Sequence, residues 1–138
     1  MLKVSHEDLV DDGRAASPRL PDLLAAMEEL QKRVSTMVVL TRGADPALAR
    51  LDGEVLEVVV PELEQVHHRG AGDALTAGMT AALAHGAGPR RALAVGAAAG
   101  AANVTRHGLA SGQRDTIEAL AERVVVRPLE DRTVKEER

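Results

Sequence analysis

The spacing of apolar positions changes several times along the chain, and each spacing predicts a different kind of element. Residues 36–40 are continuously apolar or β-branched, which is typical of a strand buried on both faces. Between residues 21 and 33 the apolar positions recur three or four apart, which predicts a helix with one buried face. Pro21 suits the first turn of that helix.

A strong hairpin signal follows the buried strand. Asp52 and Gly53 stand between two apolar runs, at 47–51 and 55–60, and a two-residue Asp-Gly turn favours antiparallel pairing of such runs. The remaining predicted elements are a strand at 1–5, a helical segment at 6–12 with Ser5 as its N-cap, helices at 74–84, 89–105 and 113–123, and a strand at 124–126. Helices that alternate with buried strands indicate an α/β layered sheet.

Composition narrows the classes of function. The 138 residues are 45% hydrophobic, enough for a real core, yet the chain has no Phe, Tyr or Trp. The lack of aromatic rings and the net charge of −4 argue against a nucleic-acid partner. The absence of Cys excludes thiol chemistry and disulfides. We expect no membrane partner and a cytoplasmic location, because the most apolar run, 92–104, is too short to span a bilayer and no signal-peptide pattern is present.

The candidate chemistry lies in Gly70-Ala71-Gly72-Asp73, directly before a strongly helical run. Small residues at a helix N-terminus expose backbone N–H groups that bind an anion. Asp73 places one carboxylate beside that anion, where it could act as a general base. The alternative is that Asp73 only stabilises the positive end of the helix dipole.

The order of these signals resembles the C-terminal half of the ribokinase-like (PfkB) carbohydrate kinases. The resemblance rests on a strand that ends in Thr41-Arg42-Gly43, a hairpin, the segment Gly70–Asp73 and an Ala-rich helix with Ala77-Gly78, and it extends from Leu2 to about Leu129. The 1-phosphofructokinase-like branch is similar in this region. The stretch 101–108 resembles the helix end that closes the nucleotide pocket in some members.

The resemblance implies a layered αβα fold, present as its C-terminal portion, over residues 1–129. The charged run at 130–138 is expected to be a disordered tail. The resemblance also implies an ATP-dependent kinase that uses Mg²⁺ and moves a phosphoryl group to a hydroxyl of a sugar or sugar phosphate. Asp73 would be the catalytic base, and Gly70, Ala71 and Gly72 would form the anion hole. The implied nucleotide-binding residues are Thr41, Gly43, Gly72 and Asn103.

Two segments depart from the family pattern. The family's Asn-x-x-Glu motif, which helps to organise Mg²⁺, falls on Ser5-His6-Glu7-Asp8, so Asp8 is the candidate metal residue. His67, His68 and Arg69 stand where the family has an Asp and hydroxyl residues. Arg69 is a candidate for binding a substrate phosphate, and a surface role is the alternative.

Three other sites keep a plain structural reading beside the functional one. Thr41 and Gly43 could mark only a strand-to-turn transition. Asn103 could bind the nucleotide or cap a neighbouring turn. Gly96 and Gly100 are spaced for close packing of helices, and close approach to a nucleotide is the alternative. In addition, Arg42 is expected to be a solvated charge, with a charge that faces a phosphate as the alternative.

Family members are much longer than this chain, and the half that supplies most sugar contacts has no counterpart in it. We therefore expect a truncated form, or a complementing partner chain that supplies the N-terminal half. Two other functions stay open: a nucleotide-binding remnant without turnover, and an assembly module whose open sheet edge pairs with another chain, as in a homo-oligomer.

Overall fold

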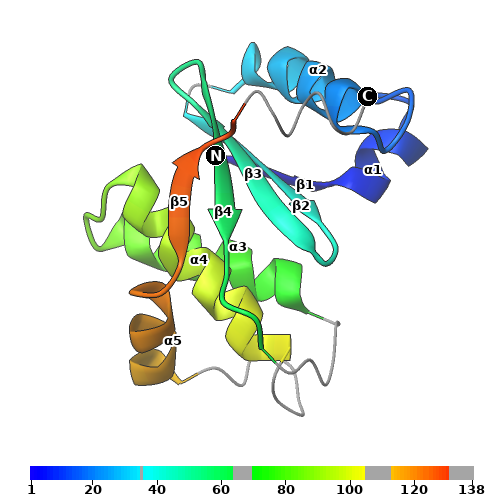
Figure 1. Ribbon diagram of the computed structural model, residues 1–138. Helices are drawn as coiled ribbons and strands as arrows, with labels where there is room; N and C mark the ends of the chain where they lie inside the picture. The colour runs from blue at the N-terminus through cyan, green and yellow to red at the C-terminus, as the bar shows by residue number, and fades with distance from the viewer. Residues whose placement is uncertain (35, 64–69, 105–112, 131–138) are drawn as a thin grey trace. The chain divides into compact units, whose positions relative to one another are not determined.

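The computed structural model describes residues 1–34, 36–63, 70–104 and 113–130. The chain divides into two compact units, one of residues 1–57 and 127–138, the other of residues 58–126. The elements, in chain order, are β1 (Leu2–Ser5), α1 (His6–Asp11), α2 (Leu20–Gln31), β2 (Met37–Arg42), β3 (Asp45–Leu51), β4 (Glu54–Val59), α3 (Ala71–Ala84), α4 (Pro89–Val104), α5 (Arg114–Ala121) and β5 (Val125–Pro128) (Figure 1).

The described strands form one mixed sheet in the order β1-β2-β3-β4-β5. β1 runs parallel to β2, with Ser5 opposite Thr41, and β2 runs antiparallel to β3. The register of the second pair shifts between Leu40 and Arg42, so the end of β2 departs from regular pairing. The carboxyl ends of β1 and β2 lie at the same edge, where α/β sheets bind ligands.

The core of the first unit lies between the sheet and the helices α1 and α2. Val38 and Leu40, which alternate along β2, pack with Leu48 of β3 against these helices. Met37 and Val39, on the opposite face of β2, are buried as well. The prediction of a strand buried on both faces is therefore confirmed.

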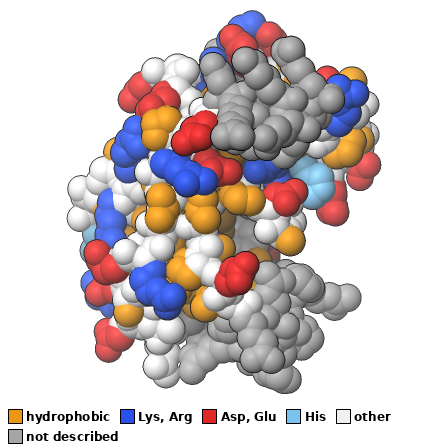
Figure 2. Space-filling model, in the orientation of Figure 1, with side chains coloured by type: hydrophobic (Ala, Val, Ile, Leu, Met, Phe, Trp, Pro, Cys, Tyr) orange, Lys and Arg blue, Asp and Glu red, His pale blue; other side chains and the backbone are white. Residues whose placement is uncertain are grey.

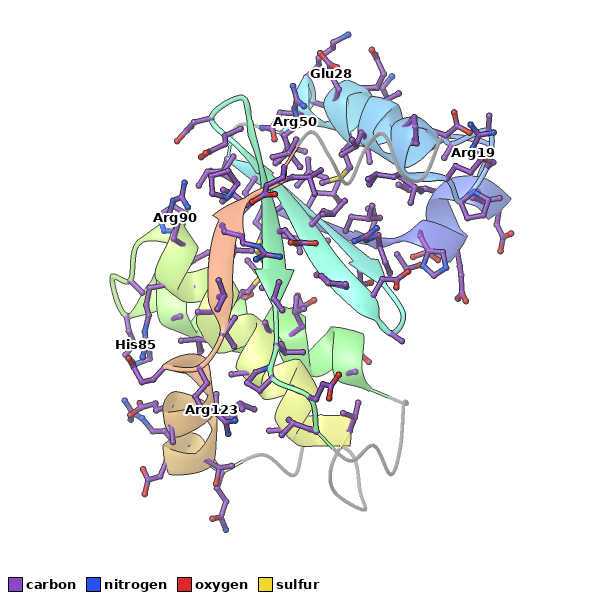
Figure 3. All side chains as sticks on the ribbon, in the orientation of Figure 1. Arg19, Glu28, Arg50, His85, Arg90 and Arg123 are labelled. Carbon is purple, nitrogen blue, oxygen red and sulfur yellow. The ribbon has the colours of Figure 1, made fainter. Side chains whose placement is uncertain are left out.

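Buried and half-buried charges on this sheet have partners. Arg127 of β5 donates two hydrogen bonds to Glu57 Oε2 of β4, at 3.0 and 2.8 Å. Arg50 of β3 forms an ion pair with Glu28 of α2, with 3.7 Å between Nη2 and Oε1 (Figure 3). These contacts hold charged groups that would otherwise be costly to remove from water.

The turn between β3 and β4 confirms the predicted hairpin. Asp52 has a φ of 50° and Gly53 a φ of 83°, so both residues adopt the left-handed conformation of a two-residue turn. Asp tolerates this conformation, and Gly adopts it without steric cost.

The second unit is built on the close approach of α3 and α4. A Cβ atom added at Gly78 of α3 would lie 2.8 Å from Ala99 Cβ of α4. One added at Gly96 of α4 would lie 2.8 Å from the Leu75 carbonyl oxygen of α3. The absence of side chains at these positions lets the two backbones pack closely, which confirms close helix packing at Gly96 and Gly100.

Helix α5 covers another side of α4. Leu120 and Ala121 of α5 are buried with Ala98 and Ala102 of α4 in a small apolar cluster. Arg91 of α4 adds an ion pair to the exposed Glu122, with 2.8 Å between Nη1 and Oε1.

Three observations refine the predicted elements. Helix α3 begins at Ala71 rather than Ala74, so the glycine loop itself forms its first turn. Strand β2 extends to Arg42, which is 8% exposed and donates from Nε to the Pro46 carbonyl oxygen at 2.9 Å. The expectation of a solvated Arg42 was wrong, because its side chain is buried and bonds to the backbone of β3 at Pro46. Residues 131–138 lie outside the described residues.

The surface carries both signs of charge. On the face shown in Figure 2, Lys and Arg side chains are interspersed with Asp and Glu rather than gathered into one basic patch. Within the described ranges, no helix is long and apolar enough to cross a membrane.

The turn provides a test of the hairpin. Replacing Gly53 with Ala should lower the free energy of unfolding by about 1–2 kcal/mol, because a Cβ atom is strained at positive φ. Urea denaturation measures the loss. The control is Asp52→Asn, which should leave stability almost unchanged because Asn adopts this conformation readily. Equal stability of Gly53→Ala and the wild type would contradict the assigned turn.

Candidate functional site

The N-terminus of α3 has the form of an anion-binding loop. Gly70 is the N-cap residue, with φ of 80° and ψ of 0°, and no side chain caps the helix there. The Gly70 carbonyl oxygen accepts the Ala74 N–H at 2.9 Å, which starts the helical hydrogen bonding. Helix geometry therefore leaves the N–H groups of Ala71, Gly72 and Asp73 without an acceptor inside α3.

Asp73 lies in this first turn, and its side chain is exposed. The carboxylate is accessible to a proton donor, and it lies beside N–H groups that attract negative charge. The next turn is held by Thr76, whose hydroxyl donates to the Gly72 carbonyl oxygen at 2.9 Å. The loop thus combines backbone donors for an anion with an accessible acceptor for a proton.

Ser5 and Asp8 form a capping box at the N-terminus of α1. The Asp8 N–H donates to Ser5 Oγ at 3.0 Å, and the Ser5 N–H donates to Asp8 Oδ2 at 3.1 Å. Hydrogen bonding by Ser5, its side chain first and its backbone second, holds the pKa of the Asp8 carboxyl below its ordinary value. Asp8 is therefore ionised at neutral pH, and one of its oxygens holds the helix start.

Thr41 and Gly43 lie at the same sheet edge as this capping box. Thr41 is opposite Ser5 in the β1–β2 pairing, and its hydroxyl donates to the Val4 carbonyl oxygen at 3.4 Å. Gly43 has a φ of 65°, and a Cβ added there would lie 3.9 Å from Cε1 of His6. The sheet therefore brings together the Ser5–Asp8 segment and the Thr41–Gly43 segment, which are distant in sequence.

Asn103 is 2% exposed and lies in the last turn of α4. It is engaged in an interaction within the protein. The same helix reaches the anion loop through Gly100, three residues earlier: a Cβ added there would lie 2.9 Å from the Ala71 carbonyl oxygen.

Sequence reasoning missed two contacts of these segments. His6, which approaches Gly43, had no recognisable pattern because its position follows from strand pairing. Gly100 was noticed for its spacing from Gly96, but that spacing did not reveal which carbonyl it meets. Arg69, His67, His68 and residues 105–108 lie outside the described residues. In the part of the chain that is described, no three His, Asp or Glu side chains gather as a metal cluster.

Comparison with known proteins places these features in one family. The sequence profile described as "pfkB family carbohydrate kinase" matches residues 2–116. A 1-phosphofructokinase of Haloferax volcanii is 41% identical over 75 residues, which cover 54% of this chain and 25% of that protein. An adenosine kinase of Schizosaccharomyces pombe is 38% identical over 76 residues, which cover 53% of this chain and 22% of that protein.

A solved structure shows the same fold. The phosphofructokinase-2 of Escherichia coli, in complex with potassium, superposes with a TM-score of 0.76 at 24% identity, over 87% of this chain and 39% of that one. The match spans about a quarter of the length of the two curated relatives.

The capping box gives a test at the sheet edge. Ser5→Ala should cost about 1 kcal/mol of the free energy of unfolding, because the N-cap acceptor is lost. The pKa of Asp8 is lower in the folded chain than its ordinary value of 3.8. Its contribution is therefore complete above that value and is lost as the pH falls through the lower, folded pKa.

Chemical denaturation from neutral pH down to about pH 2 measures both effects. Asp8→Asn is the matched control, since it removes the titrating group, and its stability should fall less steeply with acidification than that of the wild type. Identical slopes for the two proteins would contradict the pKa assignment.

Proposed function

The chain belongs to the pfkB family of carbohydrate kinases, and we propose that it binds MgATP and carries the phosphoryl-transfer loop of an enzyme acting on a sugar or sugar phosphate. The observation that carries this proposal is the uncapped N-terminus of α3, with Gly70 in a left-handed conformation and Asp73 exposed in the first turn. Such a loop supplies the two functions that phosphoryl transfer requires, donors for the phosphate and an acceptor for the proton.

The proposed reaction forms one bond and breaks another. The hydroxyl oxygen of the acceptor attacks the γ-phosphorus of ATP, and the bond from that phosphorus to the oxygen bridging to the β-phosphate breaks, which releases ADP. The hydroxyl proton passes to the Asp73 carboxylate. Within the Gly70–Gly72 anion hole, the N–H groups of Ala71 and Gly72 stabilise the negative charge on the transferred group.

Nucleotide contacts are proposed within each unit by itself. In the first unit, Thr41 and Gly43 end β2 at the edge where α/β sheets bind ligands. In the second unit, Gly72 offers its N–H, and Asn103 lies in the last turn of α4. We propose each of these residues as a separate candidate contact to the nucleotide.

The residues present fit a single Mg²⁺ ion that is held chiefly by the phosphates of the bound nucleotide. Mg²⁺ in kinases keeps several waters and binds one or two carboxylates together with the phosphates. Asp8 is exposed and ionised at neutral pH, and only its Oδ2 atom is used by Ser5. Asp8 would hold the ion, which neutralises charge on the phosphates when bound.

The acceptor is proposed as a class rather than a compound. The curated relatives carry the names 1-phosphofructokinase and adenosine kinase, which differ in what is phosphorylated. Arg69, directly before the anion hole, is the proposed contact for a phosphate on a sugar-phosphate acceptor. A cytoplasmic location, where ATP is available, accords with this proposal.

Nucleotide binding without turnover is the second candidate function. The observation that favours it is that His67, His68 and Arg69 stand directly before the anion hole, where the family pattern has an Asp and hydroxyl residues. In that case the chain binds the nucleotide, and its proposed partner is either a second copy of itself or a complementing chain that supplies the N-terminal half.

Isothermal titration calorimetry with MgATP, together with a sugar-phosphorylation assay on the same sample, tests the proposal. We expect MgATP to bind the wild type and the Asp73→Asn variant with similar affinity. Where turnover is measurable, Asp73→Asn should reduce kcat by about 10²–10⁴-fold because the proton acceptor is lost.

Asp115→Asn is the control, since Asp115 is likewise in the first turn of a helix of the second unit. It should leave binding and turnover unchanged. Binding without any turnover by the wild type would favour the second candidate. Unchanged turnover in Asp73→Asn would exclude Asp73 as the base.

A further inference from the structure

Gly100 of α4 faces the backbone of the anion loop. A Cβ atom built on Gly100 would lie 2.9 Å from the Ala71 carbonyl oxygen, 3.8 Å from the Ala71 carbonyl carbon and 3.5 Å from Leu75 Cβ. The first of these separations is shorter than Cβ atoms show in folded proteins. Any side chain at residue 100 would therefore require the first turn of α3 to shift.

The carbonyl group that Gly100 contacts is linked rigidly to an N–H group that we propose donates a hydrogen bond to the bound anion. The Ala71 carbonyl and the Gly72 N–H belong to the same planar peptide unit. A displacement of the Ala71 oxygen must therefore turn the Gly72 N–H, which has no acceptor within α3. Preorganised donors are effective only while their direction is maintained.

We propose that Gly100 is a positioning residue, which sets the direction of the Gly72 N–H by letting α4 pack against the Ala71 carbonyl. The functional part of this proposal rests on the proposed kinase site. In this proposal Gly100 touches neither the sugar nor the phosphates. Gly100 acts only through the peptide unit between Ala71 and Gly72.

The other close glycines of this interface meet different groups. A Cβ at Gly96 would contact the Met79 side chain and the Leu75 carbonyl oxygen, one helical turn beyond the loop. One at Gly78 would lie 2.8 Å from Ala99 Cβ, about two turns from the loop. Gly78→Ala is therefore a matched control. Its Cβ atom would crowd the same pair of helices, at 2.8 Å compared with 2.9 Å for Gly100, but away from the N–H groups proposed to bind the anion.

The experiment compares the ¹⁵N-labelled wild type, Gly100→Ala and Gly78→Ala. Amide NMR reports the backbone, and titration with MgATP reports binding. In Gly100→Ala we expect shifted amide resonances at residues 71–74 and at least tenfold weaker MgATP binding. In Gly78→Ala we expect shifts near residues 78, 95 and 99, with affinity for MgATP within twofold of the wild type.

The amide spectra separate failure of this proposal from failure of the proposed function. One outcome is that the wild type fails to bind MgATP while Gly100→Ala, but not Gly78→Ala, shifts the amide resonances of residues 71–74. That result would support the contact and overturn the nucleotide site. Unchanged Gly72 resonances and unchanged affinity in Gly100→Ala would overturn the positioning role. Equal loss of affinity in both variants would also overturn it, because general crowding of the interface would then explain the effect.

A measurement on the wild type covers the case in which Gly100→Ala fails to fold. An anion bound at the Gly72 N–H should perturb the whole planar peptide unit, including the Ala71 carbonyl that Gly100 contacts. MgATP should therefore shift the Hα resonances of Gly100 and leave those of Gly78 in place. Equal shifts, or none at Gly100 on saturation with MgATP, would contradict the proposal.

Discussion

The second unit depends on the approach of two helix backbones without intervening side chains. This approach requires glycine at residues 78, 96 and 100, because a Cβ atom at any of these positions would clash with the opposite helix. The contact differs from ordinary apolar packing in that several of the groups it brings together are backbone atoms. Packed backbones have few alternative arrangements, so α4 supports the start of α3 as a rigid surface. The first turn of α3 is therefore supported by α4 at Gly100.

In the first unit, parallel pairing has a comparable role. Ser5 and Thr41 are 36 positions apart in the sequence, yet they are direct partners in the sheet. Their pairing brings the Ser5–Asp8 segment next to the Thr41–Gly43 segment. The pairing places the capped start of α1 beside the turn that ends β2. At the start of α1 and the end of β2, most of the polar groups belong to the backbone or to short polar side chains. Groups of this kind can bind a phosphate through directed hydrogen bonds.

Membership of the pfkB family is the basis on which we propose functional roles for these features. Phosphoryl transfer needs little covalent help from a protein, and its catalysis is mainly positioning and charge stabilisation. A loop of small residues at a helix N-terminus meets this need without large or reactive side chains. The chain can accordingly have no Cys and no aromatic residue and still belong to a kinase family.

The sequence by itself determined the local features. The apolar run of β2, the Asp52-Gly53 turn, the Ser5 cap and the glycines before α3 were all predictable, because each depends on neighbours within a few residues. The element order was also enough to recognise the family. Only the tertiary structure decided that Arg42 is buried, that His6 approaches Gly43 and that Gly100 meets the Ala71 carbonyl. These contacts join residues distant in sequence, and their partners follow from strand pairing and helix packing, which no local pattern specifies.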